Sequence, residues 1–130
     1  MAAAPLTILV ADDDAEIRRM LKFHLEDRGF VVAEASNGAL ALEHLLTEPV
    51  DAVVLDVMMP ELNGWEVLKY LRAKEAFKDL PVLMLTGIGE SLNSLTSPVF
   101  GASAHLDKPF DLDDVDRMLR ELLKGTEPNR

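Results

Sequence analysis

Three aspartates in this chain follow apolar runs, and their type and spacing suit the binding of a metal ion. Asp12 and Asp13 come directly after LTILVA at residues 6–11, and Asp56 follows AVVL at residues 52–55. Two carboxylates about 4 Å apart repel each other by about 4 kcal/mol at an effective dielectric constant of about 20, so such a cluster is expected where a cation is bound. Mg²⁺ takes oxygen ligands, typically one or two carboxylates plus waters. The acids therefore predict a Mg²⁺ site, provided that the fold brings them together.

Asp56 is also placed for chemistry on phosphorus. A carboxylate can act as a nucleophile and form an acyl phosphate. Because phosphoryl transfer depends largely on positioning and charge neutralisation, an ammonium such as that of Lys108 would assist it. Thr86 ends another apolar run, and its hydroxyl could bond a phosphoryl oxygen. If the bond between Lys108 and Pro109 is cis, it would aim the lysine back over the same region.

Each of these residues also has a purely structural interpretation. Asp12, Asp13 or Asp14 could cap the helix that follows, because aspartate accepts hydrogen bonds from free backbone N–H groups there. A cap needs one acid, however, and this chain has three in a row. Lys108 could be a surface lysine or the ion-pair partner of an acid. Thr86 suits a strand in any case, because β-branched residues favour strands.

Alternating strands and helices would position these side chains. Short apolar runs predict five strands, at residues 6–11, 30–35, 52–56, 81–86 and 102–107. Helical periodicity and end signals predict helices from the acids to Gly29, from Asn37 to Pro49, from 63 or 64 to about 74, and from a cap at Asp111 onward. Residues 91–100 give the weakest helix, because their Asn, Ser, Thr and Pro content disfavours one.

The same periodicity predicts which helical side chains are buried. The predicted inward residues are Ile17, Met20, Leu21 and Leu25, then Ala39, Leu42, Leu45 and Leu46, then Trp65, Val67, Leu68 and Leu71, and finally Leu112, Val115, Met118, Leu119 and Leu122.

Five alternations of strand and helix with short connections predict an α/β fold. Such a chain forms a doubly wound parallel sheet with helices on both faces and right-handed crossovers. Ligands bind at the carboxyl ends of the strands in sheets of this kind. All five candidate residues, Asp12, Asp13, Asp56, Thr86 and Lys108, would then meet at one edge of the sheet.

Composition narrows the class of protein further. The chain has 130 residues, no cysteine and a formal net charge of −10 at pH 7. We expect one domain over residues 1–130, with a core of about 6–124 and short tails. The charge argues against direct binding of nucleic acid. No apolar run approaches the about 20 residues of a membrane span, and residues 1–5 do not resemble a signal peptide, so we expect a cytoplasmic protein with no membrane partner.

These blocks together resemble the receiver domain of two-component response regulators. The resemblance rests on ILVADDD at 8–14, LDVMMP at 55–60 with Gly64, Thr86, GA at 101–102 and KPF at 108–110, and it covers residues 7–124. It implies the flavodoxin-like (βα)5 sheet with strand order 2-1-3-4-5. It also implies that Asp56 accepts a phosphoryl group from a histidine kinase or a phosphotransfer protein. Mg²⁺ would bind Asp13 and Asp56, helped by Asp12 and the backbone carbonyl of Met58.

The resemblance further implies a switch that acts on a downstream protein, with no enzymatic activity beyond its own phosphorylation and dephosphorylation. Thr86 would be the switch hydroxyl and Lys108 the lysine that engages the phosphoryl group. His105 stands where the family usually has Tyr or Phe, which puts the coupling of that position to Thr86 in question. Residues 91–100 depart from the family because they are polar and contain Pro98.

Other functions fit the sequence less well. A constitutive interaction module with a vestigial acid pocket remains the alternative, and weak or absent Mg²⁺ binding would distinguish it. A phosphohydrolase acting through an aspartyl phosphate generally needs a second acid two residues after its nucleophile, where this chain has Met58. A nucleotide-binding flavodoxin-like domain would need a Gly-rich phosphate loop after the first strand.

Overall fold

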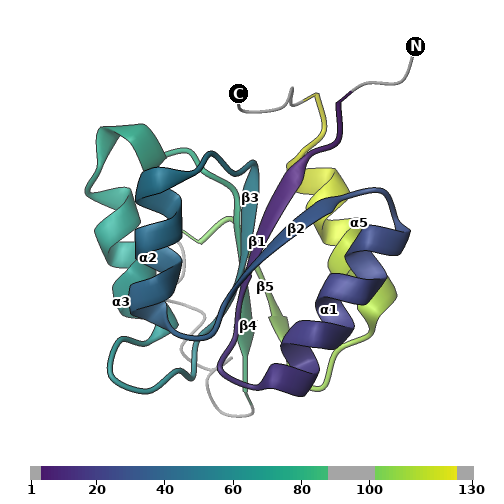
Figure 1. The fold of residues 1–130 in the computed structure, drawn as a ribbon, viewed down its shortest axis with the longest axis horizontal. Coiled ribbons are helices and arrows are strands. Elements are labelled where there is room, and N and C mark those ends of the chain that lie inside the picture. The colour runs from purple at the N-terminus through teal and green to yellow at the C-terminus, as the bar shows by residue number, and fades with distance from the viewer. Residues whose placement is uncertain (1–3, 88–101, 126–130) are drawn as a thin grey trace.

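Five parallel strands form one sheet in the order β2-β1-β3-β4-β5, as predicted (Figure 1). The computed structural model describes residues 4–87 and 102–125. The strands are β1 Thr7–Ala11, β2 Val31–Ala35, β3 Ala52–Asp56, β4 Val82–Thr86 and β5 Ala104–Asp107. β1 pairs with both β2 and β3, and β4 pairs with both β3 and β5. β2 thus lies on one side of β1, while β3, β4 and β5 follow on the other side, so β2 and β5 are the edge strands.

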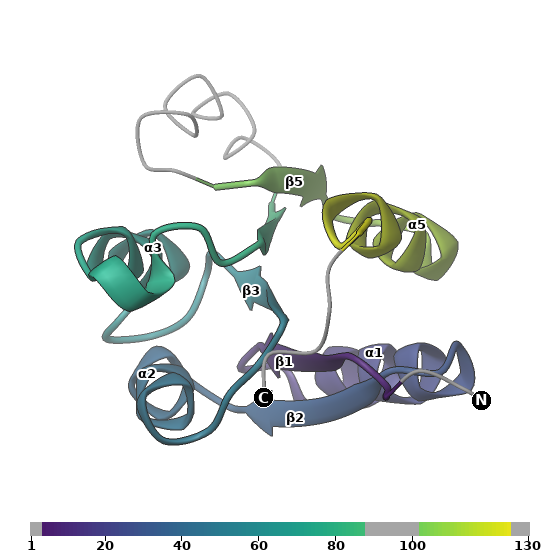
Figure 2. The same cartoon turned by 90° about the horizontal axis from the view of Figure 1, so that it is seen from above.

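Helices cover both faces of this sheet (Figure 2). They are α1 Ala15–Asp27, α2 Gly38–Thr47, α3 Gly64–Arg72, the short 3₁₀ helix η1 Glu75–Phe77, and α5 Leu112–Leu122. α1 and α5 lie on one face, while α2 and α3 lie on the other. The predicted helix at 91–100 falls outside the described residues.

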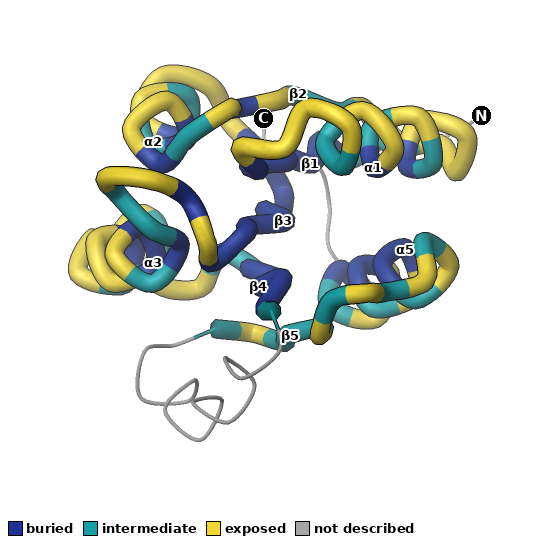
Figure 3. The backbone as a smooth tube through the Cα atoms, turned by 90° about the horizontal axis from the view of Figure 1, so that it is seen from below, coloured by how far each residue is buried: buried dark blue, intermediate teal, exposed yellow. Residues whose placement is uncertain are grey.

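The three central strands are buried on both faces, because their side chains alternate between two hydrophobic cores (Figure 3). Leu9, Val53 and Met84 belong to the core under α2 and α3. Their sequence neighbours Ile8, Val54 and Leu85 belong to the core under α1 and α5. Continuous apolar runs are therefore the sequence signature of these strands.

Side chains set where the helices begin. Asp14 caps α1 by accepting from the backbone N–H groups of Glu16 and Ile17, so one of the three acids in a row does serve as a cap. Asn37 caps α2 by accepting from Leu40 N. Asn63 and Glu66 form a reciprocal capping box on α3. Asp111 occupies the cap position of α5, but its side chain makes no capping hydrogen bond, so that part of the prediction was wrong.

The predicted buried faces were wrong at three helical positions. Met20 of α1 is 52% exposed and Leu46 of α2 is 57% exposed, and Ala39 is also exposed. In α2 the buried residues are the predicted Leu45 together with Gly38 and Ala41. The other predicted helical positions are buried or half-buried.

Candidate functional site

The ends of four neighbouring strands bring the predicted site residues to one edge of the sheet. Asp12 directly follows β1, while Asp56, Thr86 and Asp107 are the last residues of β3, β4 and β5. β1 and β3 pair directly, so Asp12 and Asp56 lie side by side at the carboxyl edge. Lys108 follows β5 and reaches back over them.

Asp12, Asp13 and Asp56 form a cluster of acids, as the sequence predicted. Each offers a carboxylate oxygen, and these oxygens all lie within 4.8 Å of one another. Asp12 and Asp56 are buried, whereas Asp13 is exposed. The cluster is therefore open to a small ion on the Asp13 side and closed by protein on the other.

The ammonium of Lys108 compensates part of this negative charge. Lys108 Nζ donates to Asp56 Oδ1 at 2.9 Å and lies 3.9 Å from Asp12 Oδ2. The Lys108–Pro109 bond is cis, the isomer for which the sequence predicted this orientation. Asp56 Oδ1 also accepts from the backbone N–H of Met58 at 3.3 Å.

One oxygen in the cluster has no hydrogen-bond partner. Asp12 Oδ1 accepts from the backbone N–H of Asp14 at 2.9 Å, but Asp12 Oδ2 is buried and accepts no hydrogen bond, with Lys108 Nζ 3.9 Å away. A buried charged oxygen without a partner is unfavourable unless a ligand completes its contacts. Because the donors in this cluster are all oxygens, the residues fit a hard divalent cation such as Mg²⁺.

Burial dominates the electrostatics of the acids. It raises the pKa of Asp56 from 3.8 to about 6, against the opposing effect of the hydrogen bond from Lys108. Burial also raises the pKa of Asp12, while the N–H of Asp14 and the charge of Lys108 oppose that rise. Burial alone lowers the pKa of Lys108, but its hydrogen bond to Asp56 and the charges of Asp56, Asp12 and Asp13 outweigh it, so the pKa of Lys108 is raised.

Thr86 lies at the predicted strand end, but its hydroxyl is already engaged. Thr86 is 1% exposed, and its Oγ1 donates to Asp107 Oδ1 at 2.7 Å. This contact with Asp107 was not among the contacts predicted from the sequence. Pairing of β4 with β5 places Thr86 opposite Asp107, so correct alignment of these two predicted strands would have revealed it.

His105 and Met58 occupy positions consistent with their predicted roles, which stay predictions. His105 is half-buried in β5 and pairs with Met84. Its neighbour Leu106 packs into the core under α1 and α5, so alternation directs His105 to the opposite face. Met58 is 65% exposed beside Asp56.

Gly64 lets the start of α3 pack against the backbone of Asp56, a role that its place in the motif did not reveal. Its N–H donates to Val57 O at 2.9 Å. A Cβ at this position would lie 2.5 Å from Asp56 O and 2.9 Å from Val57 Cα. Only glycine therefore lets the start of α3 approach the backbone of the acid so closely.

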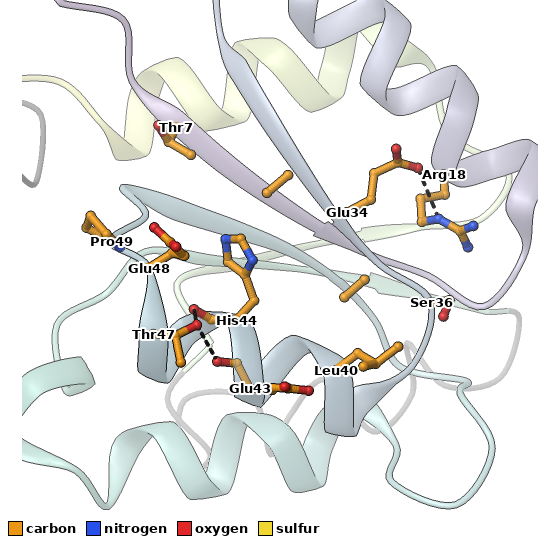
Figure 4. Close-up of a pocket in the computed structure, with 12 residues that line it drawn as sticks. Thr7, Arg18, Glu34, Ser36, Leu40, Glu43, His44, Thr47, Glu48 and Pro49 are labelled. Atoms are coloured by element: carbon orange, nitrogen blue, oxygen red, sulfur yellow. Dashed lines mark hydrogen bonds and ion pairs between the residues drawn. The ribbon is translucent and has the colours of Figure 1, made fainter.

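A hollow between β2 and α2 contains none of the acids of the cluster (Figure 4). Its lining includes Glu34, His44 and Arg18. Arg18 already donates to Glu34 Oε1 at 3.1 Å and to Asp12 O at 2.7 Å. Its cation is thus neutralised by groups within the protein, and we place the candidate site at the strand ends.

Comparison with known proteins identifies the family. Residues 8–120 match the model of the response regulator receiver domain. The chain belongs to this family. The receiver domain has the predicted flavodoxin-like topology, and its described residues include no helix long and apolar enough to cross a membrane.

Named relatives of this receiver domain are regulators. Response regulator MprA of Mycolicibacterium vanbaalenii is 40% identical over 125 residues, which cover 96% of this chain and 53% of MprA. The probable transcriptional regulator ycf27 of Cyanophora paradoxa is 41% identical over 120 residues, which cover 92% of this chain and 49% of ycf27. The receiver domain spans about half the length of these curated relatives.

Two solved structures share the fold over nearly their whole length. A putative response regulator from Chloroflexus aurantiacus J-10-fl superposes with a TM-score of 0.87 at 32% identity, covering 92% of this chain and 98% of that one. The chemotaxis response regulator CheY4 of Vibrio cholerae gives a TM-score of 0.86 at 31% identity, covering 92% and 100%.

Proposed function

We propose that this receiver domain is a phosphorylation switch whose acceptor is Asp56. The donor would be the phosphohistidine of a histidine kinase or a phosphotransfer protein. The observation that carries the proposal is the contact of Lys108 Nζ with Asp56 Oδ1 beside Asp12 Oδ2, a buried oxygen that accepts no hydrogen bond. A carboxylate that could act as the nucleophile, its counter-charge and an oxygen that could bind a cation would thus lie within one cluster. Membership of the receiver family supports the same reading.

The transfer exchanges one bond to phosphorus for another. An Asp56 oxygen attacks, the P–O bond forms, and the P–N bond to the donor imidazole breaks. The imidazole leaves with the electron pair and takes up a proton from water. The contacts from Lys108 and from Met58 N both fall on Oδ1, so Oδ2 is the attacking oxygen in this proposal.

Asp12, Asp13 and Asp56 would hold Mg²⁺ together with the backbone carbonyl of Met58. When bound, the ion supplies positive charge that stabilises the transferring phosphoryl group. The acids themselves orient the site, because Asp12 is fixed by Asp14 N and Asp56 by Met58 N. Asp13 is exposed and can adjust without disturbing the core.

Lys108 and Thr86 would act on the phosphoryl group once it is on Asp56. Lys108 lies close enough to Asp56 to follow the charge from the carboxylate to a phosphoryl oxygen. Thr86 ends the neighbouring strand β4 and could donate its hydroxyl to another phosphoryl oxygen. Their movement would alter the surface around β4 and β5 and so the affinity for a downstream protein.

Several sequence predictions stay part of this proposal. The receiver domain would catalyse only its own phosphorylation and dephosphorylation. It would act in the cytoplasm, without direct contacts to nucleic acid or membrane. The relative ycf27, named as a probable transcriptional regulator, is about twice as long as this chain, so its role in transcription is not carried over to it.

Intact mass after exposure to a small phosphodonor tests the proposal. With Mg²⁺ present, the mass of the wild type should rise by about 80 Da, the mass of one phosphoryl group. When EDTA is present from the start, the mass should not change. Asp56→Asn should gain nothing, whereas Asp111→Asn, which changes an exposed acid outside the cluster, should behave as the wild type. A wild type that binds no Mg²⁺ and gains no mass would instead indicate the constitutive interaction module.

A further inference from the structure

Asp107 holds the one hydroxyl that the proposed switch requires. Thr86 Oγ1 donates to Asp107 Oδ1 at 2.7 Å, while Leu106 O lies farther away, at 3.4 Å. Thr86 and Asp107 are directly paired in the β4–β5 register. Strand pairing therefore fixes the two side chains next to each other at the same edge of the sheet.

This hydrogen bond competes with the proposed role of Thr86. A hydroxyl carries one proton, so it can donate to one acceptor at full strength. A carboxylate is a stronger acceptor than a neutral oxygen. Because Thr86 is 1% exposed, water offers its hydroxyl little alternative. A proton given to Asp107 is consequently withheld from any group at Asp56.

We infer that Asp107 is a positioning residue that restrains Thr86 while Asp56 is unphosphorylated. A phosphoryl group on Asp56 must draw the hydroxyl away from Asp107 before the switch completes. The strength of this bond thus sets how readily the phosphorylated domain adopts its active state. The inference rests on the proposed function, since it takes Asp56 as the acceptor.

The negative charge of Asp107 provides a competing explanation for any effect on phosphoryl binding. Asp107 directly precedes Lys108, so its charge alone would disfavour an incoming anion. The two explanations differ in whether they need Thr86. Removal of Asp107 acts through the hydroxyl in the first case and independently of it in the second, so a double-mutant cycle separates them.

The first experiment measures beryllofluoride binding at saturating Mg²⁺ by titration calorimetry. It compares the wild type with Asp107→Ala, Thr86→Val and the double variant. Loss of a hydrogen bond to an exposed carboxylate should tighten binding about five- to tenfold in Asp107→Ala. The same substitution should change nothing in the Thr86→Val background. Thr86→Ser keeps a hydroxyl, so Asp107→Ala should tighten binding again in that background.

Two results of this titration would overturn the inference. One is equal binding by the wild type and Asp107→Ala. The other is an equal gain from Asp107→Ala with and without the threonine hydroxyl, which would assign the effect to charge.

The second experiment tests the hydrogen bond without relying on phosphoryl chemistry. It records thermal unfolding of the same four proteins in EDTA. Asp107→Ala should lower the midpoint in the wild type and leave it unchanged in Thr86→Val. Equal drops in both backgrounds would show that the bond is absent and would reject the inference by itself.

The two experiments also distinguish failure of the inference from failure of the proposed function. If the unfolding cycle shows the bond while wild type and Asp56→Asn bind beryllofluoride equally poorly, the acceptor assignment fails. The regulatory role of Asp107 is then rejected along with it, and the bond is purely structural.

Discussion

Lys108 contacts two buried carboxylates unequally: its Nζ lies 2.9 Å from Asp56 Oδ1 but 3.9 Å from Asp12 Oδ2. The shorter distance is a hydrogen bond and the longer one is not. Lysine therefore satisfies the proposed nucleophile and leaves an oxygen of its neighbour for another ligand. Lys108 would thus compensate mainly the charge of Asp56, and the expected Mg²⁺ would compensate the remaining charge of the acids.

Replacement of Lys108 by methionine should slow phosphorylation strongly. The ammonium would be lost from the charge that develops in the transfer, and loss of one such donor typically reduces rates about a hundredfold or more. Its hydrogen bond also lowers the pKa of Asp56, so the variant should need a higher pH to ionise the acceptor. Initial rates with a small phosphodonor measure both effects.

Lys124→Met provides the matched control for this substitution. Lys124 pairs with Glu121 on the surface and its side chain is 78% exposed. Its replacement should leave the rate unchanged, and a similar loss in both variants would point to net charge rather than to the contact with Asp56.

Without metal, stability should fall as pH rises through the titration of Asp56. The pKa of Asp56 is raised in the fold from 3.8 to about 6, so the unfolded chain releases this proton first. The protonated Asp56 carboxyl therefore stabilises the fold fully below pH 3.8, and this contribution is lost as the pH rises through about 6. The loss in free energy of unfolding should be about 1–3 kcal/mol. Urea unfolding in EDTA across this range measures the change.

Asp56→Asn isolates the contribution of this group. The variant should show a smaller fall over the same pH range and should be more stable than the metal-free wild type at pH 7. Acids outside the cluster contribute equally to both proteins, so the difference between them reports on Asp56 and on its interaction with Asp12 and Lys108. A difference that grows in favour of the wild type with rising pH would contradict the assignment.

Asp13→Asn should remove Mg²⁺ affinity without weakening the fold. Asp13 is exposed, so in EDTA the variant should unfold within about 0.5 kcal/mol of the wild type. At a Mg²⁺ concentration of about 100 times the dissociation constant, the wild type should gain about 2.7 kcal/mol and the variant should gain much less.

The neighbouring acid supplies the control for Asp13. Asp14 caps α1, and asparagine caps helices as well as aspartate does. Asp14→Asn therefore changes the local charge equally but should retain Mg²⁺-dependent stabilisation. Equal losses in the two variants would show that general charge, rather than ligation by Asp13, governs the binding.

Gly64→Ala should be among the most destabilising substitutions at the site. The added Cβ meets backbone atoms of Asp56 and Val57, which cannot move aside as a flexible side chain would. We expect a loss of about 2–3 kcal/mol and slower phosphorylation, because the strain falls on the acceptor. Gly29→Ala is a suitable comparison, since Gly29 has φ +95° but open space around its Cβ position. That change should cost about 1 kcal/mol and leave phosphorylation intact.

Asp116→Ala should disrupt the contact between α1 and α5. Asp116 is 5% exposed, and its Oδ1 lies 2.7 Å from His24 Nε2. Arg28 and Arg120 lie nearby, so the carboxylate compensates several donors. We expect a loss of about 1–3 kcal/mol in urea unfolding. Asp113, whose side chain is 77% exposed, should lose less than about 0.5 kcal/mol on replacement by alanine.

The sequence predicted the strand ends better than the helix faces. Parallel topology forces residues after successive strands to meet at one edge, so Asp12, Asp56 and Lys108 could be brought together without coordinates. Helical periodicity is less exact, because it does not determine how each helix rotates against the sheet. Met20 and Leu46 were therefore assigned to the core although both are exposed.

Contacts that depend on strand register could not be predicted from the motifs. The hydrogen bond from Thr86 to Asp107 requires that β4 and β5 be aligned without a shift of even one residue.

Other contacts depend on details that residue types do not determine. The close approach of Gly64 to Asp56 depends on the path of the loop after β3. Asp111 is a further example: an aspartate favours the cap position of a helix, but its residue type does not ensure that the side chain makes the capping hydrogen bond.

The strand order has a consequence for a chain still emerging from the ribosome. β1 and β3 pair with each other, so the acids can assemble once synthesis has passed Asp56. Lys108 is 52 residues further along and follows an edge strand that pairs only with β4. A nascent chain at that stage carries the carboxylates without their ammonium. Under the proposed function, full competence to accept a phosphoryl group would therefore arise only when the sheet is finished, and incomplete chains would be phosphorylated slowly.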